Sequence, residues 1–195
     1  MRIALVAVAA AFVTLLPIPS QAASWRHQDP DRDVYYWGRG PYSAAPANRT
    51  ADVTGLRVQH SQREVVLTLQ LRQARRDGFA VAWYLRTSER PKQYVLQLSR
   101  WDADQRYFRL VYDWTERGTF QRVTCAHKTW SVAPRADTYT LTIPRSCLDN
   151  PAWVRSGVIT GVPGGDEMAY YDDALVDGFA TYYQAKISAH RVRRG

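Results

Sequence analysis

The chain has 195 residues, with 26 lysines and arginines against 18 aspartates and glutamates, which gives a formal net charge of +8. Its length fits one domain of ordinary size with a real core, and beyond the N-terminus no segment reaches transmembrane length. A basic surface can meet nucleic acid, anionic polymers or anionic lipid. Because the arginines are scattered over turns and outward strand positions, we expect no nucleic-acid partner.

The first 22 residues have the pattern of a cleaved signal peptide. Arg2 is followed by an apolar run from Ile3 to Leu16 and then by Ser20-Gln21-Ala22, small residues at the cleavage positions. An uncleaved anchor is the alternative, but an apolar core of about 14 residues is shorter than the ~20 that a bilayer requires. We therefore predict cleavage after Ala22 and a secreted protein with no membrane span.

Residues 23–55 show neither helical nor strand periodicity for long. The segment is rich in Pro, Gly, Ala and aromatic residues. Tyr35, Tyr36 and Trp37 are too apolar for a solvated linker. We predict an irregular entry segment of which part packs on the domain, with a loop over 39–50.

From Leu56 onward, apolar and polar residues alternate with the period of half-buried strands. Gly and Pro turn signals, such as Asp77-Gly78, separate the runs. Helical periodicity is thin, with one short turn possible over 146–150. The candidate strands are 56–60, 65–72, 79–85, 93–100, 106–114, 119–125, 128–133, 138–144, 153–162 and 178–188. About ten short strands predict an all-β domain over 56–188, an antiparallel sandwich or barrel, and 189–195 should be a frayed basic end.

Cys125 and Cys147 are the whole thiol content of the chain. In an exported protein an intramolecular disulfide is the default interpretation. Two buried free thiols are the alternative, and no His or Cys stands at the spacing of a metal site. We expect the bond to pin the corner after strand 138–144, where Pro144 ends the pairing.

Three short motifs resemble a known family. These are Asp52-Val53-Thr54-Gly55-Leu56-Arg57-Val58, the strand Val65–Leu71, and the corner Ile143–Leu148. They resemble exported actinobacterial proteins similar to DOMON domains and family-nine carbohydrate-binding modules, over roughly 29–188. The resemblance implies an antiparallel β-sandwich that binds a ligand, such as a sugar, rather than an enzyme. Haem-binding members use Met and His ligands, whereas Met168 is the single Met after residue 22.

Two acidic stretches are candidate sites. Asp29, Asp31 and Asp33 alternate and offer hard oxygen ligands to calcium. An EF-hand is excluded, because Val34 and Gly40 occupy its Gly and Glu positions. A different calcium site could recruit Asp172 or Asp173, and a solvated acidic turn is the alternative. Apart from this possible calcium, we expect no cofactor.

The second stretch combines carboxylates and tyrosines, the residue types of a sugar-binding rim. Tyr84, with parity opposite to the core residue Trp83, should be exposed if only one face of its sheet is buried. An exposed aromatic row is the other feature that sugar binding requires, and aromatics at strand positions are more often core. The candidate rim residues are Tyr84, Asp166, Glu167, Tyr170, Asp172 and Asp173; the candidate aromatic row is Tyr84, Tyr94, Tyr107, Tyr112 and Trp114.

No catalytic signature is present: the chain has no G-x-S-x-G elbow, no H-E-x-x-H and no phosphate-binding loop. We therefore expect a noncatalytic binding or interaction module, with a cell-wall glycan as the leading ligand. The alternatives are a structural or protein-interaction domain of the envelope that meets a protein partner, and a hydrolase using Glu167.

Overall fold

The structure is a computed structural model. It describes residues 22–38, 41–89, 93–101, 104, 106–114, 119–165, 168–178 and 185–195. The predicted leader, except for Ala22, falls outside these ranges. Among the residues described, no helix is long and apolar enough to cross a membrane.

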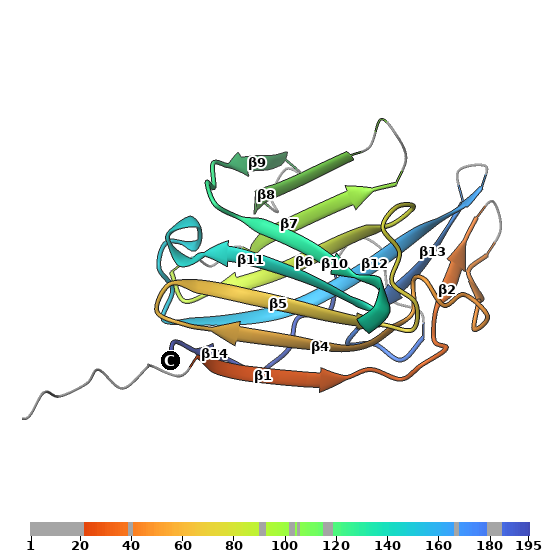
Figure 1. The fold of residues 1–195 in the computed structure, drawn as a ribbon, viewed down its shortest axis with the longest axis horizontal. Helices are drawn as coiled ribbons and strands as arrows, with labels where there is room; N and C mark the ends of the chain where they lie inside the picture. Colours follow the sequence, from red (N-terminus) through yellow and green to blue (C-terminus); the bar gives the residue numbers. More distant parts are fainter. Residues whose placement is uncertain are drawn as a thin grey trace, which may run out of the picture.

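Two antiparallel sheets lie face to face (Figure 1). The five-stranded sheet has the order β1-β4-β5-β11-β10, with bounds Ala23–Gln28, Val53–His60, Glu64–Leu71, Thr138–Pro144 and Thr129–Ala133. The second sheet has the order β3-β2-β13-β12-β6-β7-β8-β9, and β14 pairs with β12. Its bounds are Ser43–Ala44, Tyr35–Trp37, Met168–Asp173, Trp153–Gly165, Ala80–Thr87, Gln93–Arg100, Arg106–Trp114, Thr119–Val123 and Val192–Arg193.

Strand alternation builds the core between the sheets. In β5, Val65, Leu67 and Leu69 are fully buried, whereas Thr68 and Gln70 face outward. Trp83 is fully buried, as its parity predicts, and its indole N–H donates to the buried Ser156 hydroxyl. The predicted all-β antiparallel sandwich is confirmed, and the helical content of the described residues is limited to the short 3-10 turns Pro134–Ala136 and Arg145–Leu148.

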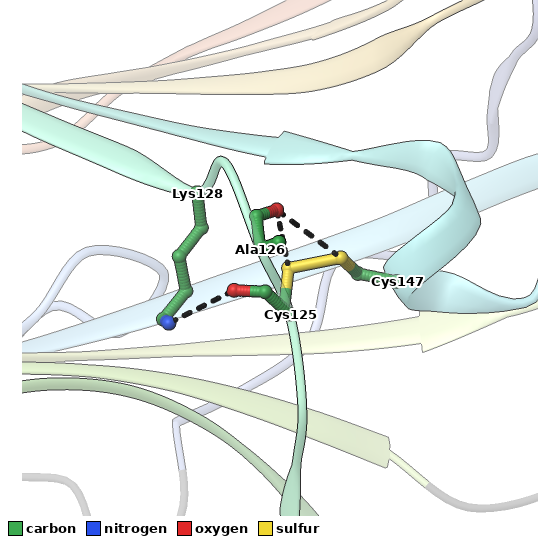
Figure 2. Close-up of a disulfide and its surroundings, with 4 residues drawn as sticks. All are labelled: Cys125, Ala126, Lys128 and Cys147. Atoms are coloured by element: carbon green, nitrogen blue, oxygen red, sulfur yellow. Dashed lines mark hydrogen bonds between the residues drawn. A yellow bond between two sulfur atoms is a disulfide. The ribbon is translucent and has the colours of Figure 1, made fainter.

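The disulfide between Cys125 and Cys147 is confirmed (Figure 2). Cys125 follows β9 of one sheet, and Cys147 lies in the 3-10 turn after β11 of the other. The Lys128 ammonium donates to the Cys125 carbonyl oxygen at 3.1 Å. The bond therefore ties the two sheets together at one end of the sandwich.

The N-terminal segment is more regular than predicted. Residues 23–55 contain β1, β2 and β3 and the start of β4. β1 pairs with β4 along its whole length, so that Trp25 and His27 take inward positions beside Val58 and Leu56. The prediction of an irregular segment was wrong, because a strand of six residues between polar neighbours is too short to stand out as a pattern.

The C-terminal end is docked rather than frayed. Val192 is buried, β14 pairs with β12, and the Gly195 N–H donates to the His60 carbonyl at 3.1 Å. Residues 185–188, predicted to be part of a strand, are not in a strand. They cross the outer face of the larger sheet, where a Cβ at Gly157 would stand 1.9 Å from the Lys186 carbonyl oxygen.

Candidate functional site

A cross-strand row of small residues between two tyrosines marks the outer face of the larger sheet. The register aligns Tyr171 on β13, Gly161 on β12, Ala80 on β6, Ser99 on β7 and Tyr107 on β8. Neighbouring strands are spaced by about 4.8 Å, so the two tyrosines stand roughly 19 Å apart along the row. Ala80, Gly161 and the two tyrosines border a hollow at this row, which we call the outer cleft.

Gly161 lets two aromatic rings lie close to the floor of the outer cleft. A Cβ at this position would lie 2.9 Å from the Tyr171 ring and 3.3 Å from the Trp101 ring. Both distances are shorter than ordinary contacts, so the two rings can lean over the floor only above a glycine. The cleft has a volume of about 120 Å³. Pockets for drug-sized ligands measure about 300–1,000 Å³, so this cleft suits one ring of a ligand.

Polar side chains border the cleft on β7 and β8. The Arg109 guanidinium donates to the Gln97 amide oxygen at 2.6 Å and lies 4.3 Å from the centre of the Tyr107 ring. This pair holds the Gln97 amide and the Tyr107 ring in place beside the floor. Tyr107 is 37% exposed, one of two large apolar residues of the described chain that remain exposed. A stacking face and hydrogen-bonding groups thus meet in one hollow.

A larger groove lies on the outer face of the five-stranded sheet. It measures about 520 Å³ and is bordered by Arg26, Arg57, Thr68 and Gln70 over the floor at Gly55. Among the described residues, no Trp or Tyr side chain lines it. Although it is larger, this groove therefore offers no aromatic face comparable to that of Tyr107 in the outer cleft.

The predicted rim residues do not come together. Tyr84 is on the outer face but 8% exposed, because residues 185–187 pack on it with Val95, Val111 and Ile159. The outer face of the sheet is covered at this point, so the condition under which Tyr84 would face solvent is not met, although Tyr84 does line the outer cleft. Tyr170 packs against the main core, and the centre of its ring lies 5.1 Å from the centre of the Tyr36 ring.

The rim carboxylates are dispersed as well. Asp172 faces inward, where its carboxylate accepts the Val53 N–H at 2.6 Å. Asp173 is buried on the other side of β13, and its two oxygens accept the N–H groups of Leu175 at 3.1 Å and Lys186 at 2.8 Å. Asp166 and Glu167 lie outside the described residues.

The predicted aromatic row is reduced to one member. Tyr94 and Tyr112 are buried in the main core, and the Trp114 side chain lies outside what the structure describes. Only Tyr107 is exposed and borders a cleft. Sequence reasoning missed Gly161 and Trp101, because a glycine floor is recognised only when the strands on each side are known.

Two of the three predicted calcium ligands meet a residue from far along the chain. Asp29 and Asp33, after β1, and Asp172, on β13, each place a carboxylate oxygen within 4.8 Å of the others. We call these three residues the acidic cluster. Asp31 is not a member: its exposed carboxylate lies 3.7 Å from the Arg32 guanidinium. Arg32 has a φ of 71°, and this turn breaks the strand alternation that would align all three aspartates.

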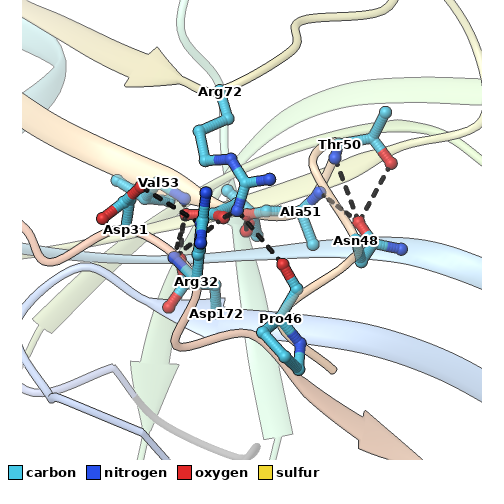
Figure 3. A network of polar contacts seen from close by, with 11 residues as sticks. Asp31, Arg32, Pro46, Asn48, Thr50, Ala51, Val53, Arg72 and Asp172 are labelled. Carbon is cyan, nitrogen blue, oxygen red and sulfur yellow. Dashed lines mark hydrogen bonds and ion pairs between the residues drawn. The ribbon is translucent and has the colours of Figure 1, made fainter. Parts of the chain in front are cut away.

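Asp52 neighbours the acidic cluster but has its own partners. Its buried carboxylate accepts the Arg32 N–H at 3.2 and 3.0 Å and forms an ion pair with Arg72. Figure 3 shows Arg72, Arg32 and the Pro46 carbonyl gathered at this point, with Val53 and Asp172 beside them. Burial nevertheless raises the pKa of Asp52, against the lowering effect of Arg32 and Arg72.

Burial and mutual repulsion both raise the pKa values of the acidic cluster. Burial, followed by the charges of Asp172 and Asp33, raises the pKa of Asp29 to about 9. Burial and the Asp33 charge raise the pKa of Asp172 to about 8, and burial also raises that of Asp33. A buried group of like charges is unfavourable unless protons or a cation neutralise it.

Comparison with known proteins identifies no relative: no family model, no curated protein and no solved structure matches the chain. The geometry of the outer cleft and of the acidic cluster therefore carries the functional argument.

Proposed function

We propose that the protein is an exported, noncatalytic binding module that holds a sugar ring of a glycan in the outer cleft. The observation that carries this proposal is the row in which Tyr171 and Tyr107 flank Gly161, Ala80 and Ser99. Sugar rings present apolar C–H faces and a rim of hydroxyls, so they stack on aromatic rings and bond to polar side chains at the edge. Tyr107 supplies the ring, and Gln97, which Arg109 holds in place, supplies the polar edge.

The resemblance to carbohydrate-binding modules points to the same ligand class, and it stays a prediction. The small floor limits the contact to about one ring, so we expect modest affinity for a single sugar unit. Several polar residues on the outer face of the five-stranded sheet offer no comparable stacking surface.

The proposal is tested with a glycan array of neutral and acidic oligosaccharides, followed by calorimetric titration of the best binder. We expect Tyr107→Ala to weaken binding about tenfold, or about 1.4 kcal/mol, because a stacked aromatic surface is lost. Tyr107 is exposed, so this variant should fold. Thr68→Ala, in the larger groove of the other sheet, is the matched control and should bind as the native protein does. Absence of binding to every glycan by well-folded protein would refute the proposal.

A second candidate function is protein interaction through the edge formed by β2 and β3. Both residues of β3 are exposed, and Tyr42 beside them is 40% exposed, the other exposed large apolar residue of the described chain. Tyr42→Ala should reduce the yield of envelope proteins crosslinked to the purified protein. An equal yield of the same proteins with this variant would exclude the edge as the contact.

A further inference from the structure

The acidic cluster has more carboxylate oxygens than the protein has donors to satisfy. Asp29 is 6% exposed, and among the described residues neither of its oxygens meets a hydrogen-bond donor. Asp172 is fully buried, and one of its oxygens accepts the Val53 N–H while the other has no donor. Asp33 accepts the Gly178 N–H at 3.4 Å with one oxygen, and its other oxygen is buried without a donor. Four buried oxygens are thus unsatisfied within one small volume.

No side-chain cation of the described chain balances this charge. Arg72 pairs with Asp52, and the Arg32 guanidinium pairs with the exposed Asp31. Lys186 approaches through its main-chain N–H, which goes to Asp173. Buried polar groups in native proteins almost always have partners, so unsatisfied oxygens at this density indicate a missing positive ligand.

The chemistry of the donors selects the class of ligand. The cluster offers carboxylate oxygens only, and no His or Cys belongs to it. Oxygen-only sites suit the hard cations Ca²⁺, Mg²⁺ and Mn²⁺, whereas zinc favours nitrogen and sulfur ligands. Ca²⁺ accepts six to eight oxygens in flexible geometry, whereas Mg²⁺ demands a near-ideal octahedron and keeps its waters. Three carboxylates from two segments far apart in the chain favour the larger ion.

We propose that Asp29, Asp33 and Asp172 form a binding site for a divalent cation, with Ca²⁺ as the preferred ion. The inference is independent of glycan binding. The ion would bridge the segment after β1, at the edge of the five-stranded sheet, and β13 of the larger sheet. It would therefore stabilise the sandwich by joining the N-terminal segment to β13, which comes late in the chain.

Protonation is the competing way to neutralise the cluster. Burial and mutual repulsion raise the pKa values of Asp29 and Asp172, so protons compete with a cation for the cluster. A bound cation must displace these protons, so its affinity rises as pH rises. The two explanations therefore differ in their response to added calcium and can be separated in one experiment.

The test is a melting curve of the purified protein, first stripped with EDTA and then titrated with CaCl₂ or MgCl₂, together with calorimetry. At a hundredfold excess over Kd, we expect Ca²⁺ to raise Tm by about 5–10 °C and Mg²⁺ to raise it less. Asp29→Asn and Asp172→Asn should abolish the response. Asp31→Asn, in the same loop but outside the cluster, should keep it in full.

The substituted proteins should remain folded, because each loses a repelling charge without changing shape, and the Tm in EDTA verifies this. If 10 mM CaCl₂ leaves the Tm of the native protein unchanged and calorimetry detects no binding, the cluster is held by protons alone and the proposal is wrong. A larger Tm increase with Mg²⁺ than with Ca²⁺ would overturn the choice of calcium. A full response retained by both Asp29→Asn and Asp172→Asn would place the ion elsewhere.

Discussion

The Asp52–Arg72 pair shows how one residue makes a buried charge tolerable. The Asp52 side chain is fully buried, and the Arg72 side chain is 17% exposed. Removing one partner of a buried pair leaves the other charge uncompensated, which is far more costly than the pair itself is stabilising. Arg72 also donates to the Pro46 carbonyl at 3.2 Å and so anchors the loop before β4.

We predict that Arg72→Met lowers the free energy of unfolding by about 3 kcal/mol at pH 7, measured by urea denaturation. The loss should shrink below pH 5, because burial raises the pKa of Asp52 and lets the unpaired carboxyl take up a proton. The double variant with Asp52→Asn should regain part of the stability. Equal stability of Arg72→Met and native protein would show that the pair does not hold this loop.

At the scale of single residues, the sequence predicted part of the acidic cluster. Alternate aspartates suggested oxygen ligands, and Asp29 and Asp33 do converge. The inclusion of Asp31 followed from the regular spacing of the three aspartates, and the turn at Arg32 directs the Asp31 side chain away from the other two. Asp172 was named as a possible recruit, but its contact with residues about 140 positions earlier follows only from the pairing of β13 with β2 and β12.

At the scale of elements, the disulfide makes the corner after β11 a structural anchor. Cys125 and Cys147 are 22 positions apart, and they join connections that belong to different sheets. A cross-link that closes a loop of this length restricts the unfolded chain and contributes about 3 kcal/mol in the chain-entropy model. In this model the disulfide stabilises the folded protein mainly by lowering the entropy of the unfolded chain.

We predict that the free energy of unfolding of the double variant Cys125→Ser/Cys147→Ser is about 2–4 kcal/mol lower than that of the oxidised native protein. Reduction of the native protein with dithiothreitol should produce a similar loss. The measurement is urea denaturation of both samples at one pH, with the double variant in dithiothreitol as the control for side effects of the reductant. Equal midpoints for oxidised and reduced protein would contradict this role.

Strands with a clear alternation of apolar and polar residues were predicted correctly. Segments whose structure depends on pairing or packing with distant parts of the chain were not. β5 and β11 match their predicted ranges within a residue or two, because a buried face of Val, Leu and Ile has a strong period. β13 was interpreted as a loop, since Asp172 and Asp173 are unusual in a strand. The 185–188 segment was interpreted as strand, although Ala185 and Ile187 pack on the sheet surface without pairing in it.

At the scale of the whole molecule, pH should change the stability of the metal-free protein through the acidic cluster. The unfolded aspartates titrate near pH 4, whereas the folded pKa values of Asp29 and Asp172 are about 9 and 8. Between these limits the folded protein binds more protons than the unfolded chain does. The stability that these two carboxyl groups contribute is therefore fully present below about pH 4 and is lost as pH rises toward 9. Asp33, Asp52 and Asp173 add to the repulsion around Asp29.

We predict that in EDTA the urea midpoint decreases from pH 7 to pH 8.5. Asp29→Asn should flatten this dependence, because the group with the largest raised pKa is removed. Burial lowers the pKa of His60, so this residue reduces the stability of the protein as pH falls below the pKa of an unfolded histidine, near 6.5. Above that pH it does not change the stability. A midpoint that rises from pH 7 to pH 8.5 in EDTA would contradict this role of the acidic cluster.

Across the whole chain, periodicity predicted the sandwich but not its strand order. The outer cleft depends on that order, because Tyr171 and Tyr107 lie 64 positions apart and are aligned by four successive strand pairings. The covering of Tyr84 by residues 185–187 is equally invisible in the local pattern. Such contacts follow from packing between distant segments, which a single sequence does not reveal.

The most direct measurement of the proposed function is an amide NMR titration of ¹⁵N-labelled protein with the best oligosaccharide from the array. The account predicts that the largest shift changes occur at Ala80, Ala82, Gln97 and Gly161, the floor and border of the outer cleft. Changes centred on Gly55, Arg57 and Thr68, in the groove of the five-stranded sheet, would contradict it.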